Sequence, residues 1–515
     1  MSSALQTGTP AVTGDGFIAR WIANVAASGR SPKKTLIGFF VAWGAFFLIL
    51  YALPTPQGLS AAGQAALAVM AWACLTWIFE SIPVGVSGLL IPMLLVLTNA
   101  VKPFPAAASG FVTPVTFLCL AAFIFAAIMQ AAGLDRRLAL LLLHVFRATT
   151  VNGVIWAMFA VNMVLSLVIP AANARAATLL PVINGITRLF GDSERERNAK
   201  KAIVIQSLVY GSMISGMCIL TAHLPNYIIV DLIGKQGFKI SYWEWFLLQW
   251  PYLGMFVITQ WWVRTYFRTK GVAAHGGSQA VEQQYREIPR MSQSEWLILA
   301  VFAFVAVLWA FESQLKIAAH NAALIGLAIL FMPGVLSFKW KEIQDRTIWG
   351  TLLLLAGALS MSDAMGKTGL AQWLADLLHP LTAGQPWWVI ILVLMLGTHV
   401  MRLGMLSNVA AIAMLAPILI AMAPKLGLHP VTFTMLVCDT DTFAYILPTQ
   451  ITAAVIAYSS GTFSMTDYAK VGWVAVLIAI AYGILVMAPW YAFMGVPVWD
   501  PTAPWPFEMI APTVK

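Results

Sequence analysis

The sequence predicts an all-α protein that crosses a membrane many times. Hydrophobic residues make up 60% of its 515 residues and charged residues only 10%, and the mean hydropathy is +0.81. Apolar runs of the length that a spanning helix needs, roughly 20 residues, recur along the chain. A soluble domain carries about 25% charged residues, so this composition excludes a soluble globular protein.

Eleven apolar runs predict transmembrane helices, and two of these runs are interrupted by polar residues and proline. Residues 1–33 are polar and lack the apolar core of a signal peptide, so the first run is expected to remain as a span. The predicted spans are 36–53, 62–80, 83–101, 115–133, 202–220 with 226–234, 246–266, 295–312, 320–338, 348–365, 431–447 with 451–459, and 470–494.

Two further apolar stretches, 152–190 and 388–423, each contain a central break and predict re-entrant hairpins. In the second stretch, Ser407 and Asn408 separate two runs that are each too short to span. Non-helical backbone at membrane depth is stable only where it is buried in protein or lines a wet cavity, because unpaired backbone groups are costly in hydrocarbon. The tip at Ser407 and Asn408 is therefore expected to face a binding site. The alternative for this stretch is a single kinked helix.

The distribution of basic residues predicts how the chain lies in the membrane. Of the 30 lysines and arginines, 21 fall in loops on the side of the N-terminus and seven in loops on the other side. Cytoplasmic loops carry such an excess. We therefore expect a protein of the cell inner (cytoplasmic) membrane, with a cytoplasmic tail at 1–35 and an external tail at 495–515. These loops account for the net charge of +9, and no nucleic-acid partner is expected.

The chain divides into two similar halves. A cytoplasmic linker at 270–293 separates a first repeat, 60–269, from a second, 294–494, and the first span with its loop, 36–59, precedes both. Each half has five crossings, so the second half enters the membrane from the opposite side. Such an inverted repeat is typical of transporters, whose binding site lies near the midplane between the halves.

The two halves also have the same order of elements. Residues 115–143 parallel residues 350–378, and in each half a hairpin and then an interrupted span follow. The interruptions read TAHLPN at 221–226 and LPTQIT at 447–452. Paired broken helices at corresponding places indicate where a transporter binds its cargo.

Several phrases in these elements resemble the divalent anion/sodium symporter family of carboxylate and sulfate transporters, with some features of citrate and dicarboxylate exchangers. The similarity covers nearly everything from residue 36 to 494. The phrases are WIFESIPVGVSGLLIP (77–92), Gly133-Leu134, Gly369-Leu370, TAHLPN, MLSNVAAIAMLAPI (405–418) and TDYAKVGW (466–473). The resemblance implies a homodimer in which a transport domain moves against a fixed scaffold, an elevator mechanism. It also implies that Ser-Asn-Thr tips and the interrupted spans hold a substrate carboxylate and flanking sodium ions.

The sequence departs from that family pattern at the first tip. The tip reads Ala171-Ala172-Asn173, whereas the second tip, Ser407-Asn408-Val409, keeps two of the three family residues. Sodium prefers hard oxygen ligands, and two alanine side chains supply none. TAHLPN keeps Thr221 but has His223 where small residues are usual, and Arg175 stands in a phrase similar to one in citrate-type exchangers. These departures favour exchange or proton coupling over sodium symport.

The predicted site residues lie at the tips and interruptions. The predicted substrate-binding residues are Asn173, Arg175, Thr221, His223, Ser407, Asn408, Val409, Pro448 and Thr449. The candidates for coupling or for binding a cation are Ala172, Asp439, Asp441, His399 and Arg402. A buried arginine needs a partner, so an aspartate could hold Arg402 simply to support the second hairpin. His399 could be a packing residue, and Glu80 is interpreted as structural.

We therefore expect a secondary active transporter of small organic anions, di- or tricarboxylates, that exchanges one anion for another. A fixed charge at Arg175 would neutralise an incoming anion without sodium, and the empty carrier would then move uncompensated charge through a low-dielectric region. Sodium- or proton-coupled symport of a carboxylate or other oxyanion is the alternative, and an anion channel is a more remote one.

The expected partners are the organic anion, the lipid bilayer and a second copy of the chain. No cofactor is expected beyond sodium ions or protons as coupling ions. The sequence contains neither an HExxH metal motif nor a Walker loop. It therefore predicts neither a membrane metalloenzyme nor an ATP-driven pump.

Overall fold

The computed structural model describes residues 25, 32–146, 149–274, 289–336, 338–382, 384–405 and 407–509. These residues form helices and no strand, with two isolated bridges, Thr150 to Ala273 and Phe238 to Met509. Most of the predicted N-terminal tail and linker, and the end of the predicted C-terminal tail, lie outside the described residues. The predicted all-α class is confirmed.

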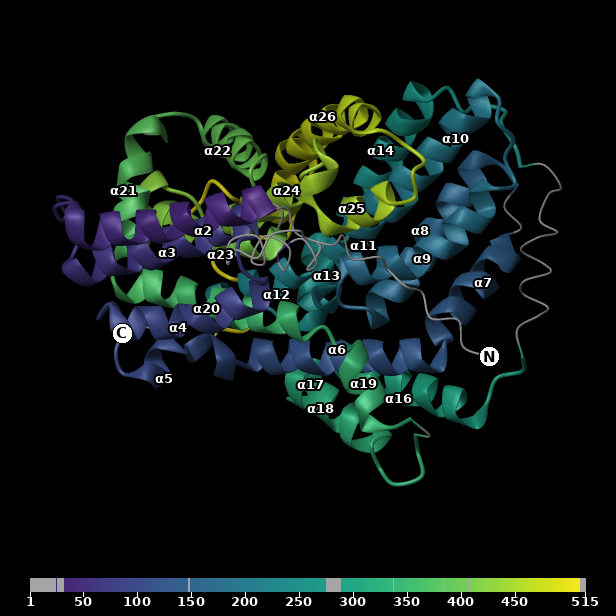
Figure 1. The fold of residues 1–515 in the computed structure, drawn as a ribbon, viewed down its shortest axis with the longest axis horizontal. Helices are drawn as coiled ribbons and strands as arrows, with labels where there is room; N and C mark the ends of the chain where they lie inside the picture. Colours follow the sequence, from purple (N-terminus) through teal and green to yellow (C-terminus); the bar gives the residue numbers. More distant parts are fainter. Residues whose placement is uncertain are drawn as a thin grey trace, which may run out of the picture.

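The helices begin and end close to the predicted boundaries (Figure 1). The helices of the first half are α2 (Pro32–Phe47), α3 (Ala61–Phe79), α4 (Val84–Leu97), α5 (Phe104–Ala107), α6 (Pro114–Ala132), α7 (Leu134–Phe146), α8 (Val151–Val168), α9 (Ala172–Thr187), α10 (Glu194–Val204), α11 (Gly211–Cys218), α12 (Leu224–Lys235), α13 (Tyr242–Gln249) and α14 (Tyr252–Tyr266). Those of the second half are α16 (Gln293–Ala310), α17 (Glu312–Leu315), α18 (Ala319–Leu330), α19 (Trp340–Arg346), α20 (Trp349–Lys367), α21 (Leu370–Thr382), α22 (Trp387–Arg402), α23 (Asn408–Met422), α24 (Pro430–Thr442), α25 (Thr452–Tyr458), α26 (Met465–Tyr482) and α27 (Ala488–Phe493).

Seven helical segments in the described part of the chain are long and apolar enough to cross a membrane, or eight if the bent pair α19 and α20 forms one span. Shorter apolar helices such as α4, α8, α18 and α22 accompany them. The chain is thus a multi-pass membrane protein, and the number of eleven crossings stays a prediction, as do the domain boundaries and the inverted relation of the halves.

Two predicted spans were wrong in their extent. The span predicted at 246–266 is divided into α13 and α14, because Pro251 at the junction has no amide hydrogen with which to continue the helix. In the span predicted at 320–338 only residues 320–330 are helical, as part of the 12-residue helix α18, which ends shortly before Pro333.

Helices from the two halves pack backbone against backbone in one layer. Figure 1 shows α2, α3, α4 and α20 running side by side at the left. A Cβ atom added to Gly88 of α4 would lie 2.2 Å from the carbonyl oxygen of Leu353, and one added to Gly357 of α20 would lie 2.3 Å from that of Gly88. Small residues allow membrane helices to approach this closely. The glycines of α4 and α20 therefore join the halves into one tightly packed unit.

Both predicted hairpins are broken at the predicted places. Between α8 and α9 the chain leaves the helix at 169–171, and α8 and α9 lie side by side in Figure 1. Between α22 and α23 the described residues 403–405 and 407 lie outside the helices. The residues before the second helices, Ala171 (φ −131°, ψ 125°) and Ser407 (φ −107°, ψ 116°), are both extended.

The interrupted spans also have matching geometry. After α11 a 3-10 turn, Leu220–Ala222, is followed by the extended residue His223 and then by α12. After α24 a 3-10 turn, Pro448–Gln450, is followed by the extended residue Ile451 and then by α25. His223 and Ile451 share ψ 127° and differ by only a few degrees in φ, at −143° and −136°. His223 and Ile451 therefore occupy equivalent positions.

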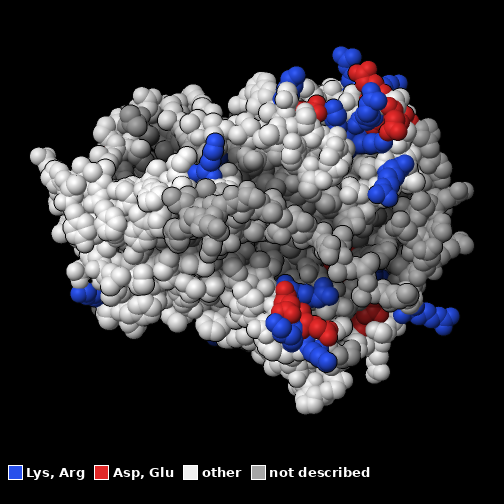
Figure 2. Space-filling model, viewed as in Figure 1, with Lys and Arg blue, Asp and Glu red and all other residues white. Residues whose placement is uncertain are grey.

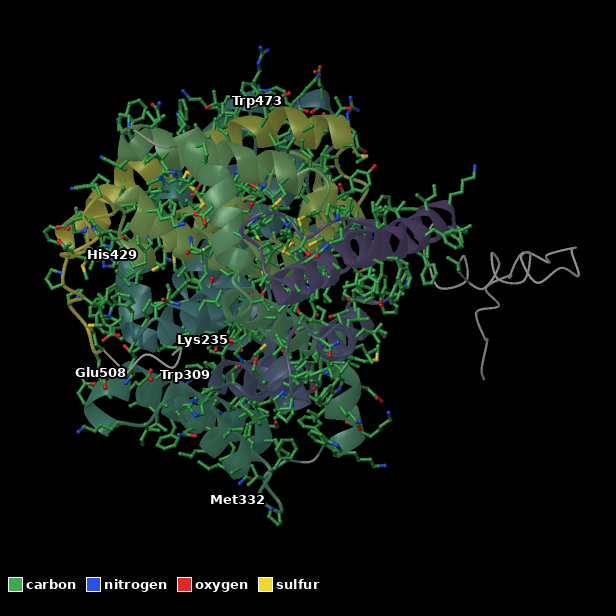
Figure 3. The ribbon with its side chains drawn as sticks, turned by 90° about the vertical axis from the view of Figure 1, so that its left-hand side faces the viewer. Lys235, Trp309, Met332, His429, Trp473 and Glu508 are labelled. Atoms are coloured by element: carbon green, nitrogen blue, oxygen red, sulfur yellow. The ribbon has the colours of Figure 1, made fainter. Side chains whose placement is uncertain are left out.

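Charged side chains gather at the ends of the helices. Figure 2 shows one group at the upper right over α10 and another at the lower centre near α19. Ion pairs join segments that were predicted to lie on one side of the membrane: Arg137 to Glu295 and Lys201 to Asp467 on the side of the N-terminus, and Lys235 to Asp363, Lys239 to Glu508 and Lys425 to Asp376 on the other. In Figure 3, Lys235, His429 and Glu508 lie on the same face of the molecule. The pairing supports the predicted grouping of loops.

Candidate functional site

Four helix N-termini meet at one cavity of about 300 Å³. The helices are α9 and α23, which begin at the hairpin tips, and α12 and α25, which begin at the interruptions. Each contributes the same three positions, the residue before the helix and the first two helical residues. The contributing residues are Ala171, Ala172 and Asn173; His223, Leu224 and Pro225; Ser407, Asn408 and Val409; and Ile451, Thr452 and Ala453.

Three of these helices have no side-chain cap. Ala171, His223 and Ile451 make no capping hydrogen bond, whereas Ser407 accepts one from the amide of Ala410. The first helical bond of α9 runs from Arg175 N to Ala171 O, and that of α25 from Ala454 N to Ile451 O. The preceding amides have no partner within the helix, and the helix dipole adds partial positive charge there. These termini are suited to bind an anion.

The opposite wall comes from the packed layer of helices. Trp77 and Glu80 at the end of α3, Val84 of α4, and Thr351 and Leu354 of α20 line it. Glu80 has a left-handed backbone (φ 51°, ψ 35°), and its carboxylate makes no hydrogen bond or ion pair with any described residue. A positive φ is uncommon for a residue other than glycine and is often found at functional sites. Glu80 therefore lies in the cavity wall at the end of α3, and its interpretation as structural stays a prediction.

Arg175 lies behind the first tip, and its guanidinium binds backbone carbonyls. Nη1 donates to Ile169 O at 2.7 Å and to Ala222 O at 2.8 Å, and Nη2 donates to Ser212 O at 2.6 Å. The side chain is fully buried and does not line the cavity. Arg175 thereby ties the break of the first hairpin to the break of the first interrupted span.

Arg402 lies behind the second tip and makes the corresponding contacts there. Nη2 donates to Gln450 O at 2.8 Å and to the side-chain oxygen of Asn408. Its Nε atom lies 3.7 Å from a carboxylate oxygen of Asp441, and both side chains are fully buried. Arg402 therefore has the aspartate partner that sequence analysis allowed for.

The polar side chains of the second tip are held within the protein. Ser407 caps α23, and Asn408 Nδ2 lies 3.3 Å from His223 Nε2 and 3.4 Å from the carbonyl oxygen of Thr442. Asn408 thus connects α23 to the interrupted spans of both halves. Because these side chains bind within the protein, the groups at this tip that remain for a ligand are backbone amides.

The family model for the sodium:sulfate symporter transmembrane region matches residues 34–496. The chain belongs to this family. A membrane protein of Cupriavidus necator is 30% identical over 487 residues, covering 90% of this chain and 94% of its own. An uncharacterized transporter of Haemophilus influenzae is 27% identical over 469 residues (88% and 96%), and the sodium-dependent dicarboxylate transporter SdcS of Staphylococcus aureus is 25% identical over 469 residues (86% and 89%).

Two solved structures share the fold of this symporter family member at low sequence identity. The YdaH transporter of Alcanivorax borkumensis has a TM-score of 0.52 and 14% identity, with coverage of 85% of this chain and 100% of its own. MtrF of Neisseria gonorrhoeae has a TM-score of 0.54 and 14% identity, with coverage of 91% and 96%. The family is one of transporters, as are the named relatives of Haemophilus influenzae and Staphylococcus aureus, and the chain is not an enzyme.

The first tip of this family member, Ala171-Ala172-Asn173, has one residue with a side-chain oxygen, Asn173. Ala171 and Ala172 offer no side-chain oxygen, and the carbonyl oxygens of Ile169 and Ala222 already accept from Arg175. No group of three or more histidine, cysteine, aspartate or glutamate residues suited to a metal occurs in the described ranges. Sodium needs several oxygen ligands, and two carbonyl oxygens at the breaks of the first half already accept hydrogen bonds from Arg175.

The other predicted site residues lie outside the cavity. Thr221 Oγ1 lies 3.2 Å from Tyr242 OH, and His399 Nδ1 lies 2.8 Å from Met395 O. Asp439 accepts a hydrogen bond of 2.6 Å from Gln249. Pro448 and Thr449 belong to the 3-10 turn, one turn before the lining residues. Their functional assignments stay predictions.

Sequence analysis missed Ile451, Thr452 and the wall residues Trp77 and Thr351. Matching TAHLPN to TQITAA at 449–454, instead of to LPTQIT, places His223 opposite Ile451 and would have found Thr452. The sequence signal for this match was a polar residue, Thr452, at the start of the apolar segment that forms α25.

Proposed function

We propose that this family member is a secondary active transporter that carries a small organic anion through the cavity. It is a transporter of anions by family. The observation that carries the proposal is the convergence of four helix N-termini, three of them uncapped, on one cavity. Broken helices with their positive ends at a central site are how many transporters hold anionic cargo. The di- or tricarboxylates of the sequence-based prediction, and the dicarboxylates of SdcS, are the first cargo to test.

Exchange of anions is the proposed mode. Arg175 is buried and has no carboxylate within ion-pair distance among the described residues, so its charge is available to an anion at the nearby amides. Without an anion this charge would cross a low-dielectric region alone, which makes return of the empty carrier costly. The arrangement therefore supports obligatory exchange over sodium symport. The proposed cargo site consists of the predicted residues that line the cavity: Asn173, His223, Ser407, Asn408 and Val409.

An elevator motion of a homodimer in the inner membrane, with the N-terminus in the cytoplasm, completes the proposal. The glycine contacts of α4 and α20 support a fixed unit, against which the hairpins and interrupted spans would move. The cavity lies between this unit and the tips, as alternating access requires.

Counterflow in proteoliposomes tests the proposal. Labelled succinate, citrate and benzoate are offered to vesicles that contain the same unlabelled anion or none. Uptake of at least one anion should saturate, should need the internal anion, and should persist when choline replaces sodium. Uptake into empty vesicles driven by an inward sodium gradient would contradict exchange, and an unsaturable current would indicate a channel.

Proton-coupled symport is a second candidate because of Asp439. This carboxylate is fully buried, accepts from Gln249, and has no lysine or arginine partner in the described ranges. Such a group is far less costly when protonated. Asp439→Asn should leave exchange intact if exchange is the mode, and should abolish pH-gradient-driven uptake if proton symport is.

A further inference from the structure

The charges around the cavity differ from those expected for a dianion. Apart from His223, Glu80 is the only ionisable side chain among the described residues that line it. Arg175 and Arg402 lie behind the wall, and Asp441 offsets the charge of Arg402. One unneutralised cation, Arg175, therefore stands behind the amides, and one carboxylate stands on the opposite wall.

The remaining lining is mostly apolar. Ala171, Ala172, Ile451 and Ala453 present only hydrocarbon at two of the four helix starts, those of α9 and α25, although the amides there are uncapped. Further hydrocarbon comes from three larger side chains of the lining: Trp77, Met213 and Leu354. A second anionic group would lie among these side chains without a cationic partner, which costs free energy.

We propose that the cargo is a monoanion with an apolar body. The anionic group binds the amides at the start of α9, in front of Arg175, and the body packs against Trp77, Met213 and Leu354. Glu80 disfavours a second negative charge at the far end of the cargo through like-charge repulsion. The volume of about 300 Å³ is at the lower end for small-molecule sites, so a single-ring acid is the size to expect. This inference rests on the proposed function and narrows its substrate class.

A matched pair of ligands tests the charge requirement. Terephthalate and 4-methylbenzoate have the same ring and one carboxylate in common, and differ by a carboxylate or a methyl group at the opposite end. In thermal-shift titrations of the purified protein, 4-methylbenzoate should bind at a concentration at least about tenfold lower than terephthalate. Equal or tighter binding of terephthalate would overturn the inference.

The role of Glu80 is tested by Glu80→Gln. This variant should narrow the preference for 4-methylbenzoate over terephthalate by about fivefold or more, because the like-charge repulsion is removed. Glu342→Gln, the same change at an exposed carboxylate on α19, is the control and should keep the wild-type preference. An unchanged preference in Glu80→Gln would refute the role of Glu80.

Counterflow separates this inference from the proposed function. Exchange of succinate or citrate, with none of benzoate or 4-methylbenzoate, would overturn the monoanion and leave the transporter proposal standing. Exchange of the monoanions ahead of the dicarboxylates supports both. Failure to exchange any of these anions would count against both.

Discussion

Arg175 and Arg402 each bind the carbonyl oxygen of the last residue of a 3-10 turn, Ala222 in the first half and Gln450 in the second. Each thereby fastens a hairpin to the interrupted span of its own half. The two arginines are reached from different helices, since Arg175 lies in α9 after its tip and Arg402 ends α22 before its tip. The shared contact is thus a property of the fold and not of sequence position.

The difference between the arginines is electrostatic. Arg402 has Asp441 at 3.7 Å, whereas the hydrogen-bond partners of Arg175 among the described residues are all carbonyl oxygens. A buried ion pair is neutral as a unit, but a buried cation held by carbonyls keeps its net charge. We infer that Arg402 in the second half mainly stabilises the structure, and that Arg175 in the first half supplies the positive charge that attracts the cargo.

The largest effect is expected from breaking the ion pair. Arg402→Met should lower the free energy of unfolding by about 3–5 kcal/mol, because it leaves Asp441 buried without a partner. The double variant Arg402→Met with Asp441→Asn should recover a large part of this loss. Denaturant or thermal unfolding in detergent measures both, and a double variant no more stable than the single one would contradict the pairing.

Arg175 should be less important for stability and more important for transport. Arg175→Met removes three hydrogen bonds but strands no carboxylate, so we expect a loss of about 1–3 kcal/mol in unfolding free energy. Anion exchange should fall by at least about a hundredfold, and Arg175→Lys should retain more of it, because lysine keeps the charge but not the planar set of donors. Exchange rates in Arg175→Met close to wild type would show that this charge does not serve the cargo.

The sequence located the breaks because polar residues and proline interrupt apolar runs there. It also identified Arg402 and the two aspartates as possible partners, but could not choose between Asp439 and Asp441. Two residues along an α-helix rotate a side chain by about 200°, so these aspartates face opposite ways. Asp441 meets Arg402 of α22 and Asp439 meets Gln249 of α13, a choice that depends on how α24 packs.

The sequence-based match of TAHLPN with LPTQIT did not give the structural register of the two interrupted spans. TAHLPN and LPTQIT both contain proline, but Pro225 is the second residue of α12 whereas Pro448 begins a 3-10 turn. Proline is compatible with both positions, because neither the first turn of a helix nor the start of a 3-10 turn needs an amide donor from that residue. His223 and Ile451 are equivalent because both have an extended backbone just before a helix. The residue types at these two positions do not by themselves require that conformation.

A smaller effect is expected at the capped tip. Ser407→Ala removes the bond from the amide of Ala410 and should cost about 1 kcal/mol of stability. Because the freed amide belongs to α23, anion affinity should be retained or rise slightly. Titration of the purified variant with 4-methylbenzoate measures this, with Ser459→Ala, a change at an exposed loop serine, as the control.

The smallest effect comes from giving the first tip the cap that the second one has. Ala171 has the extended backbone that a capping residue adopts and is one of the residues that line the cavity, so Ala171→Ser places a hydroxyl at the start of α9. The hydroxyl should accept from an amide in the first turn of α9 and stabilise the protein by about 0.5–1 kcal/mol. The same bond takes a donor away from the cargo, so anion affinity should fall by about twofold to fivefold while stability rises.

The test is that affinity and stability change in opposite directions, because a general disturbance of the tip would lower both quantities. A rise in both would mean that the amides of α9 do not bind the anion, and the binding role would then pass to the starts of α12 and α25.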